Sequence, residues 1–454
     1  MRRTCIAYGT VIYELYDSAH DGREGAPDFT GAVGVADRRL ALVSDDPRRI
    51  EAFRREHPGV REIDGTGKVL MPGLINTHCH VAMTLQRGYA DDIALMKWLH
   101  EYICLSRRSK PRTKSCWEPK WVLSKCCWAA SRRSSICTGM KPYRRGRAAA
   151  RYPGHARSEL PGYELGAFAD DVERMIATTG DCDRIRLAVA PHSPYTCSPE
   201  SLQRGKELAR RHGLWFMTHI SETEDEVRIV RERYGTTSVR HLDALGILDD
   251  RTIGAHCVHV DDGDIRILRE RGVAVSHNPQ SNMKISSGIA PIARMHSEGV
   301  LCTIGTDGTC SNNDLDMWDE MRTASFLQKV ATMDPCVLPA YEILKMATVN
   351  AARAIGHAGE LGVIKEGALA DFILIDAVKP HLTPVYNMVA NLIYCGKAAD
   401  VDTVVVNGEI VVEAAGSRAS ICRTSAPGCS IRPRTLPAVR PQRKSRLSRL
   451  PATE

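Results

Sequence analysis

Short apolar runs alternate with amphipathic segments through the middle of the chain, from Leu74 onward. The apolar runs have the length of buried strands, and the amphipathic segments have apolar residues three and four positions apart, as in a helix packed on one side. The expected strand and helix pairs are 185–190 with 199–211, 214–218 with 222–234, 252–255 with 262–271, and 301–304 with 315–330, with a further strand at 273–275. This alternation predicts βα units that build a parallel sheet.

Both ends of the chain have strand patterns instead. Near the N-terminus, residues 36–70 contain short strands and turns, and a helix-like segment at 340–355 precedes the C-terminal strands. The expected strands at the two ends are 40–43, 60–63, 372–375, 403–406 and 410–412, with an Asn407-Gly408 turn between the last two. We therefore expect β-rich ends around an α/β centre.

The composition is that of a globular enzyme and offers no membrane or secretory signal. The chain has 454 residues, 43% of them hydrophobic, which suits one large domain and a smaller one. No apolar run approaches the roughly 18 residues needed to cross a bilayer, and Tyr8, Glu14 and Asp17 interrupt any signal-peptide core. The 16 cysteines are irregularly spaced, which favours reduced thiols over a disulfide framework. We expect a cytoplasmic protein with no membrane partner.

The net charge of +7 comes from two segments and not from the chain as a whole. Residues 104–158 contain 15 Lys and Arg against one acid, and residues 417–454 contain nine against one. Once these segments, at +14 and +8, are taken from the total, the remainder has a net charge of −15. The main body is therefore acidic, and we expect it to have no nucleic-acid partner.

The two basic segments show little periodicity, and three hypotheses compete for them. A nucleic-acid-binding arm is one, and a zinc module built from Cys104, Cys116, Cys126, Cys127 and Cys137 is another, although these lack a CxxC pair. The third is out-of-frame translation, with the correct frame resuming near residue 162. We favour the third, for 104–160 and as one reading of the basic tail 416–454, the other being disorder. It explains the abrupt boundaries and the unusual composition together.

Two histidines follow the Pro-Gly-Leu-Ile run at the start of the α/β region. His78 and His80 are separated by one residue, so on a strand both imidazoles point to the same side. Two histidines placed in this way can bind one metal ion. Taken alone, the pair could equally be two core or surface histidines.

Three further strand-like runs each end in a polar residue, at His219, His256 and Asp307. In a (β/α)8 barrel the carboxyl ends of the strands build the active site, and its residues come from several strands. Histidine nitrogen and aspartate oxygen suit zinc or another divalent transition metal with an open position for water. A structural zinc site would more often be closed by cysteine.

Glu222 lies three residues after His219, at an expected strand-to-helix turn. A carboxylate beside a metal-activated water can shuttle protons. The alternative is an acid that interacts favourably with the helix dipole. The neighbouring histidine favours the first interpretation.

In order along the chain, these residues resemble the signature of a known superfamily. The motifs are His78-x-His80, His219-x-x-Glu222, His256, Ser276-His277-Asn278-Pro279 and Gly305-Thr306-Asp307-Gly308. They resemble the amidohydrolase superfamily, nearest to the 5-methylthioadenosine/S-adenosylhomocysteine deaminases, with guanine deaminase and chlorotriazine hydrolases as neighbours. The resemblance covers residues 36–103 and 162–415.

The resemblance implies an α/β fold, a (β/α)8 TIM barrel with a small β-sandwich from both chain ends. The barrel would span residues 73–358, and the sandwich residues 1–72 and 359–415. It also implies that His78, His80, His219 and Asp307 bind one divalent metal, Zn2+ or alternatively Fe2+, Ni2+ or Mn2+. The strand at 185–190 has no lysine of the kind that binuclear relatives carbamylate, which favours a single metal.

The implied reaction is hydrolytic deamination of an amino-purine nucleoside such as 5-methylthioadenosine or S-adenosylhomocysteine, by metal-activated hydroxide. Glu222 would protonate the ring nitrogen, Asp307 would take a proton from the water, and His256 would orient the water and stabilise the oxyanion. His277 is expected near this site, and the role of His259 is left open.

The implied substrate contacts are Trp98 against the purine, His192, and Glu222. Arg107 stands where the family has a glutamate for the ribose hydroxyls, and this departure begins where the composition changes. The alternatives are a chlorohydrolase, a guanine- or pterin-type deaminase, a catalytically impaired homologue, or a scaffold with a nucleic-acid-binding arm. A homo-oligomer is compatible with all of them.

Overall fold

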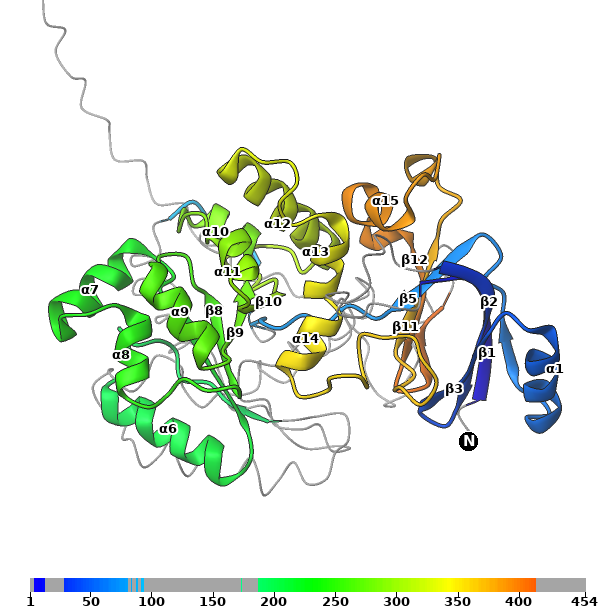
Figure 1. Cartoon of the computed structure of the whole chain (residues 1–454), viewed down its shortest axis with the longest axis horizontal. Coiled ribbons are helices and arrows are strands. Elements are labelled where there is room, and N and C mark those ends of the chain that lie inside the picture. The colour runs from blue at the N-terminus through cyan, green and yellow to red at the C-terminus, as the bar shows by residue number, and fades with distance from the viewer. Residues whose placement is uncertain are drawn as a thin grey trace, which may run out of the picture. The chain divides into compact units, whose positions relative to one another are not determined.

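The computed structural model describes residues 4–12, 28–80, 83, 87–88, 91–93, 173 and 187–413 (Figure 1). Trp98, Arg107, the segment 104–160 and the tail 416–454 lie outside these residues, so the expectations that concern them are not tested here. No helix in the described ranges is both long enough and apolar enough to cross a membrane.

A parallel sheet of five strands forms the α/β part of the fold, in the order β10-β9-β8-β7-β6. Each strand lies beside the one that precedes it in sequence, with helices between them, and this confirms the predicted βα units. The strands are β6 (Ala188–Val189), β7 (Trp215–Ile220), β8 (Thr252–His256), β9 (Ala274–His277) and β10 (Leu301–Ile304).

Residues 74–80 continue this sheet beyond β10. The Thr77 N–H donates to the carbonyl of Ile304 at 3.1 Å, and the Asp307 N–H donates to the carbonyl of His78 at 2.9 Å. The segment that holds the histidine pair therefore lies directly beside the strand that leads to Asp307.

Several of the helices in the α/β part begin where a side chain accepts from the N–H groups of the first turn. Ser198 and Thr223 accept from the first turns of α6 and α7, and Asp261 forms a capping box at α9. The helices are α6 (Pro199–Arg211), α7 (Glu224–Tyr234), α8 (Ser238–Ala244), α9 (Asp262–Glu270), α10 (Pro279–Lys284), α11 (Ile292–Ser297), α12 (Met317–Thr332), α13 (Ala340–Met346) and α14 (Val349–Ala354).

Both chain ends meet in a second, mixed sheet, in which β5 pairs antiparallel with β11. The sheet order is β13-β12-β11-β5-β1-β2-β3, and β4 pairs with β1. Its strands are β1 (Thr4–Ile12), β2 (Asp28–Ala36), β3 (Arg39–Ser44), β4 (Arg61–Ile63), β5 (Lys68–Pro72), β11 (Phe372–Asp376), β12 (Val401–Val406) and β13 (Glu409–Val412). The expected β unit from both ends is present.

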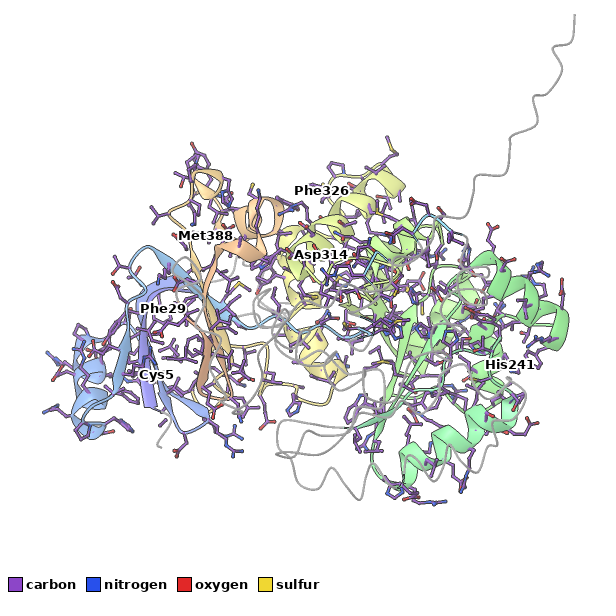
Figure 2. The ribbon with its side chains drawn as sticks, turned by 180° about the vertical axis from the view of Figure 1, so that it is seen from behind. Cys5, Phe29, His241, Asp314, Phe326 and Met388 are labelled. Carbon is purple, nitrogen blue, oxygen red and sulfur yellow. The ribbon has the colours of Figure 1, made fainter. Side chains whose placement is uncertain are left out.

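Alternating residues of this sheet face different cores. Leu70 packs with Phe372 and Leu374, whereas Met71 packs into the large core of the α/β part, with Phe216 and Ile304. All are buried, and Figure 2 shows side chains filling both faces of the sheet. The period of two therefore places one strand between two hydrophobic layers.

Three elements near the N-terminus were not expected from the sequence, namely β1, β2 and helix α1 (Pro47–Glu56). Helix α1 has Asp46 as its N-cap and buries Phe53 against the sheet. Helix α15 (Met388–Cys395) and the short 3-10 turns η3 (Pro380–Leu382) and η4 (Ala398–Asp400) complete the C-terminal part.

The single helix expected at 340–355 is wrong in detail, because the structure has two helices there. The chain leaves helical geometry at Thr348, with φ −128° and ψ −94°. A Cβ added at Gly362 would lie 2.6 Å from the Thr348 carbonyl carbon, so a second segment passes directly against this break. Tertiary packing interrupts the helix where the apolar period alone continues it.

Candidate metal and catalytic site

The carboxyl ends of β7, β8 and β10 and the segment 74–80 bring the predicted residues to one edge of the parallel sheet. At these exits His256 and Asp307 have positive φ angles of 74° and 56°, and Ser221, just after β7, has a φ of 50°. Non-glycine residues rarely adopt this region, and such strain is concentrated at functional sites. The strand ends are thus bent to aim polar side chains at a common point.

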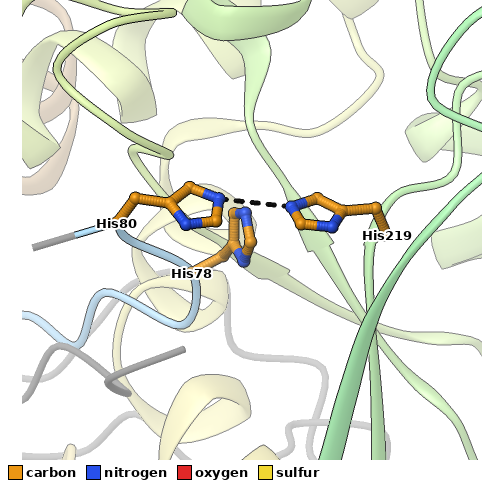
Figure 3. A group of neighbouring side chains, drawn as sticks. All are labelled: His78, His80 and His219. Carbon is orange, nitrogen blue, oxygen red and sulfur yellow. Dashed lines mark hydrogen bonds between the residues drawn. The ribbon is translucent and has the colours of Figure 1, made fainter. Parts of the chain in front are cut away.

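Three imidazoles converge at this point, His78 and His80 from one segment and His219 from β7 (Figure 3). The Nε2 atoms of His80 and His219 are 3.2 Å apart. The Nε2 atoms of His78 and His80 lie 3.3 and 3.2 Å from Oδ1 of Asp307. Two ligands bound to one tetrahedral zinc ion at ordinary bond lengths lie roughly 3.3–3.4 Å apart, so these separations fit a shared divalent cation.

Hydrogen bonds outside this cluster direct its ligand atoms inward. The Nδ1 of His219 is 2.6 Å from the carbonyl oxygen of His192 and donates to it, which leaves Nε2 with its lone pair facing the centre. Oδ2 of Asp307 accepts from the hydroxyls of Ser281 at 2.6 Å and Ser311 at 2.7 Å. Oδ1 therefore remains for the centre.

Burial and neighbouring groups shift the pKa values of three residues of the cluster, His78, His219 and Asp307. Burial lowers the pKa of His78 to about 4, and burial followed by the neighbouring imidazoles lowers the pKa of His219 well below its usual value. Burial would raise the pKa of Asp307, but His78 and His80 hold it well below the ordinary range. Neutral imidazoles and an ionised carboxylate are the forms that metal binding requires.

Glu222 and His256 face one another beside the cluster. Nε2 of His256 is 3.8 Å from Oε1 of Glu222, and both side chains are almost completely buried. Nδ1 of His256 donates to Oδ1 of Asn282 at 2.8 Å, so Nε2 is the atom turned toward the site. Burial raises the pKa of Glu222. Burial opposes a charge on His256, yet Glu222 and Asp307 raise its pKa above the usual value.

The three remaining histidines singled out in the sequence, His192, His277 and His259, lie at different distances from the cluster. The ring of His192 lies 4.7 Å from that of His219, and its Nδ1 is within hydrogen-bonding distance of Ser193 and Thr196. His277 is fully buried at the end of β9, and its carbonyl accepts from the Gly305 N–H. His259 instead bonds to the carbonyl of Ser287 and lines a surface pocket with residues of α7.

Four residues that hydrogen-bond to the site residues or to the turn beside them were missed in the sequence, namely Ser281, Ser311, Asn282 and Glu226. Ser281 and Asn282 are brought to partners 26 positions away by tertiary folding, whereas Ser311 lies only four residues after Asp307. Glu226 did carry a signal, because Thr223 and Glu226 form the S/T-x-x-E pattern of a capping box.

The model of the amidohydrolase family matches residues 163–411. A 5-methylthioadenosine/S-adenosylhomocysteine deaminase of Pelotomaculum thermopropionicum is 42% identical, over 84% of this chain and 88% of that protein. A 5′-deoxyadenosine deaminase of Methanothermobacter thermautotrophicus is 40% identical, over 85% of this chain and 92% of that protein.

Solved structures have the same fold. An adenosine deaminase from Xanthomonas campestris with bound zinc superimposes with a TM-score of 0.80 and 28% identity, covering 90% of this chain and 94% of that one. An atrazine chlorohydrolase from Arthrobacter aurescens complexed with zinc gives a TM-score of 0.78 at 21% identity, covering 90% and 96%. The second likeness concerns the fold alone.

Proposed function

The chain belongs to the amidohydrolase family, and from this premise we propose that it is a metal-dependent deaminase of adenine nucleosides of the 5-methylthioadenosine class. The proposal rests on one combined observation, which is that deaminases similar in sequence and a cluster of candidate metal ligands both point to the same reaction. Relatives named for deamination of such nucleosides are 40 to 42% identical over most of the chain. The residues to which we assign the reaction lie together at one edge of the parallel sheet, and this supports the proposal.

His78, His80, His219 and Asp307 would hold the cation, and Zn2+ is the ion we propose. A bound divalent cation lowers the pKa of water, so that hydroxide is available near neutral pH. The donor set of three imidazoles and one carboxylate supports this choice, as does the zinc in the adenosine deaminase structure.

The protein's own side chains would move the protons. Asp307 accepts a proton from water, and Glu222 delivers one to the purine ring nitrogen beside the amino-bearing carbon. His256, with Nε2 turned into the site, stabilises the negative charge that develops on the attacking oxygen. Asp307 would then pass its proton to the amino nitrogen, so that the C–N bond breaks and ammonia leaves. The hydroxyl on the same carbon would lose its proton to Glu222 and become the ring carbonyl, which restores both carboxyl groups. His192, beside His219, is placed to contact the substrate.

The five parallel strands and residues 74–80 would form part of a closed (β/α)8 barrel. The bonds from residues 74–80 to the exit of β10 support closure on that side.

A substrate panel tests the proposed function. The zinc-loaded chain is expected to release ammonia from 5-methylthioadenosine, S-adenosylhomocysteine and 5′-deoxyadenosine, and more slowly from guanine. Chloride release from a chlorotriazine, without ammonia release from any adenine nucleoside, would instead establish the chlorohydrolase alternative.

A further inference from the structure

Glu226 is a buried carboxylate in the first turn of α7, and the reaction described above does not use it. Its side chain has no solvent exposure. Oε1 accepts the N–H of Ser221 at 2.7 Å and the hydroxyl of Ser238 at 2.8 Å. Oε2 accepts the N–H of Glu222 at 2.9 Å.

This arrangement differs from the capping box that the sequence pattern suggests. Thr223 is the N-cap and accepts the Glu226 N–H at 3.3 Å. In a capping box the carboxylate would return to the N–H of the cap residue itself. Here the carboxylate reaches further back and binds the two N–H groups that precede the cap. Its bonds therefore hold the turn out of β7 rather than the helix end.

That turn connects two parts of the site. Ser221 has the strained φ of 50°, and its carbonyl accepts the N–H groups of Val258 and His259 at 3.1 Å each. The Ile220 carbonyl accepts the Cys257 N–H at 2.9 Å. The exit of β7, which carries His219 and Glu222, is thus tied to the exit of β8, which carries His256.

Burial of an ionised carboxylate destabilises the folded chain unless its hydrogen bonds compensate for the lost hydration. All three of its partners are donors, and no Lys or Arg of the described part of the chain forms an ion pair with it. Burial raises the pKa of Glu226 to about 7. A buried acid retained without a counter-cation is commonly found where its geometry has a function.

We propose that Glu226 is a positioning residue for Glu222. By accepting both N–H groups of the turn, it keeps the Glu222 carboxylate facing Nε2 of His256 and the metal cluster. This inference rests on the proposed function, because it assigns Glu222 the proton transfer.

The substitution Glu226→Gln tests the inference with little change of shape. The side-chain amide of glutamine has one acceptor oxygen and one donor nitrogen, so the oxygen can accept from only one of the N–H groups of Ser221 and Glu222. The NH2 group then faces the other N–H, and neither of these donors is satisfied. We expect kcat per bound zinc to fall about 10- to 100-fold, with KM within about twofold and zinc stoichiometry retained. Glu224→Gln, the same change at an exposed position of the same helix turn, is the matched control and should match the parent.

A double-mutant cycle separates positioning from a general structural role. If Glu226 acts through Glu222, Glu226→Gln should change the residual rate of a Glu222→Gln chain by less than about twofold. An equal fold loss in both backgrounds would overturn the proposal. So would an unchanged kcat per zinc in Glu226→Gln with the loss confined to folding or metal content.

A crystal structure of zinc-loaded Glu226→Gln gives a readout that does not need turnover. Displacement of residues 221–222, with His219 in place, supports positioning, and an unchanged turn overturns it. If the parent releases no ammonia from any nucleoside, the proposed function fails while this structure still decides the role of Glu226. The same variants in a frame-restored chain provide a second background for all of these measurements.

Discussion

The two carboxylate oxygens of Asp307 have different partners at this site. One carboxylate oxygen faces His78 and His80, and the other is held by the hydroxyls of Ser281 and Ser311. The two serines therefore select the rotamer of Asp307 that points Oδ1 at the imidazoles. We therefore expect the two serines to contribute to metal affinity.

Replacing both serines with alanine should weaken zinc binding. Without their hydroxyls, Oδ2 loses two donors and the carboxylate can rotate, so we expect about 10- to 100-fold lower zinc affinity. Competition with a chromogenic chelator measures this, and Ser297→Ala, at an exposed serine of α11, is the control. Zinc affinity equal to that of the parent would show that the serines do not hold the ligand.

Glu222→Gln should separate chemistry from metal binding. Glu222 is not among the four proposed ligands, so zinc content should be retained, while the loss of proton transfer should reduce kcat about 10²- to 10⁴-fold. Steady-state ammonia release and elemental analysis of the same sample measure both quantities. Loss of zinc together with activity would assign Glu222 to the metal site instead.

The sequence pattern predicts that His219, His256 and Asp307 lie together, because each ends an apolar strand-like run. The assignment of His78, His80, His219 and Asp307 as metal ligands came from the resemblance to the amidohydrolase superfamily. His219, His256 and Asp307 are all found at or just after strand ends, as expected. Ser281 and Asn282 could not be predicted, because a short helix after β9 brings them to partners more than 20 positions away.

At the scale of elements, the hydrophobic pattern predicts helices and strands correctly where each element buries one apolar face. It fails where contacts with distant segments decide the local structure. Helix α6 and strand β10 have the predicted bounds, since their apolar period matches the face that each one buries. Helix α1 is highly charged and buries only Phe53, so its pattern carried too little signal. The break at Thr348 depends on a distant segment that no local pattern contains.

The exit of β10 should tolerate no added side chain. A Cβ at Gly305 would lie 2.5 Å from Oδ1 of Asn278 and 2.8 Å from Cβ of His78. We therefore expect Gly305→Ala to lower the free energy of unfolding by about 1–3 kcal/mol and to reduce zinc content. Urea denaturation measures the first quantity.

Gly235→Asn is the comparison variant for this measurement. Gly235 ends α7 with a φ of 70° and has no neighbour within 4 Å of an added Cβ. Asparagine accepts that conformation, so the cost should be about 1 kcal/mol or less. Equal destabilisation by the two variants would contradict the close packing described for β10.

At the scale of the whole molecule, the two basic segments coincide with the limits of the family match. The match covers residues 163–411, which begins just after the position where we expect the correct frame to resume and ends just before the basic tail. The hypothesis that 104–160 and the tail are out of frame stays a prediction from the sequence. The division into domains, a cytoplasmic location and a homo-oligomer stay predictions from the sequence.

Restoring the reading frame of both segments should raise the soluble yield and the deaminase activity of the protein. A basic, aperiodic replacement cannot easily supply a strand that a closed barrel must bury. We expect higher soluble yield and faster ammonia release from 5-methylthioadenosine for the restored chain than for the chain with the present sequence. Equal yield and equal rate would reject the frame hypothesis.

The central claim is that one divalent cation at the His78, His80, His219 and Asp307 cluster supports deamination of an adenine nucleoside. The most direct measurement is ammonia release from 5-methylthioadenosine before chelation, after chelation, and after titration with Zn2+. We predict that chelation abolishes the reaction and that one equivalent of zinc restores it in the parent but not in a His219→Ala chain. Full activity in the metal-free protein, or full recovery in His219→Ala, would contradict the account.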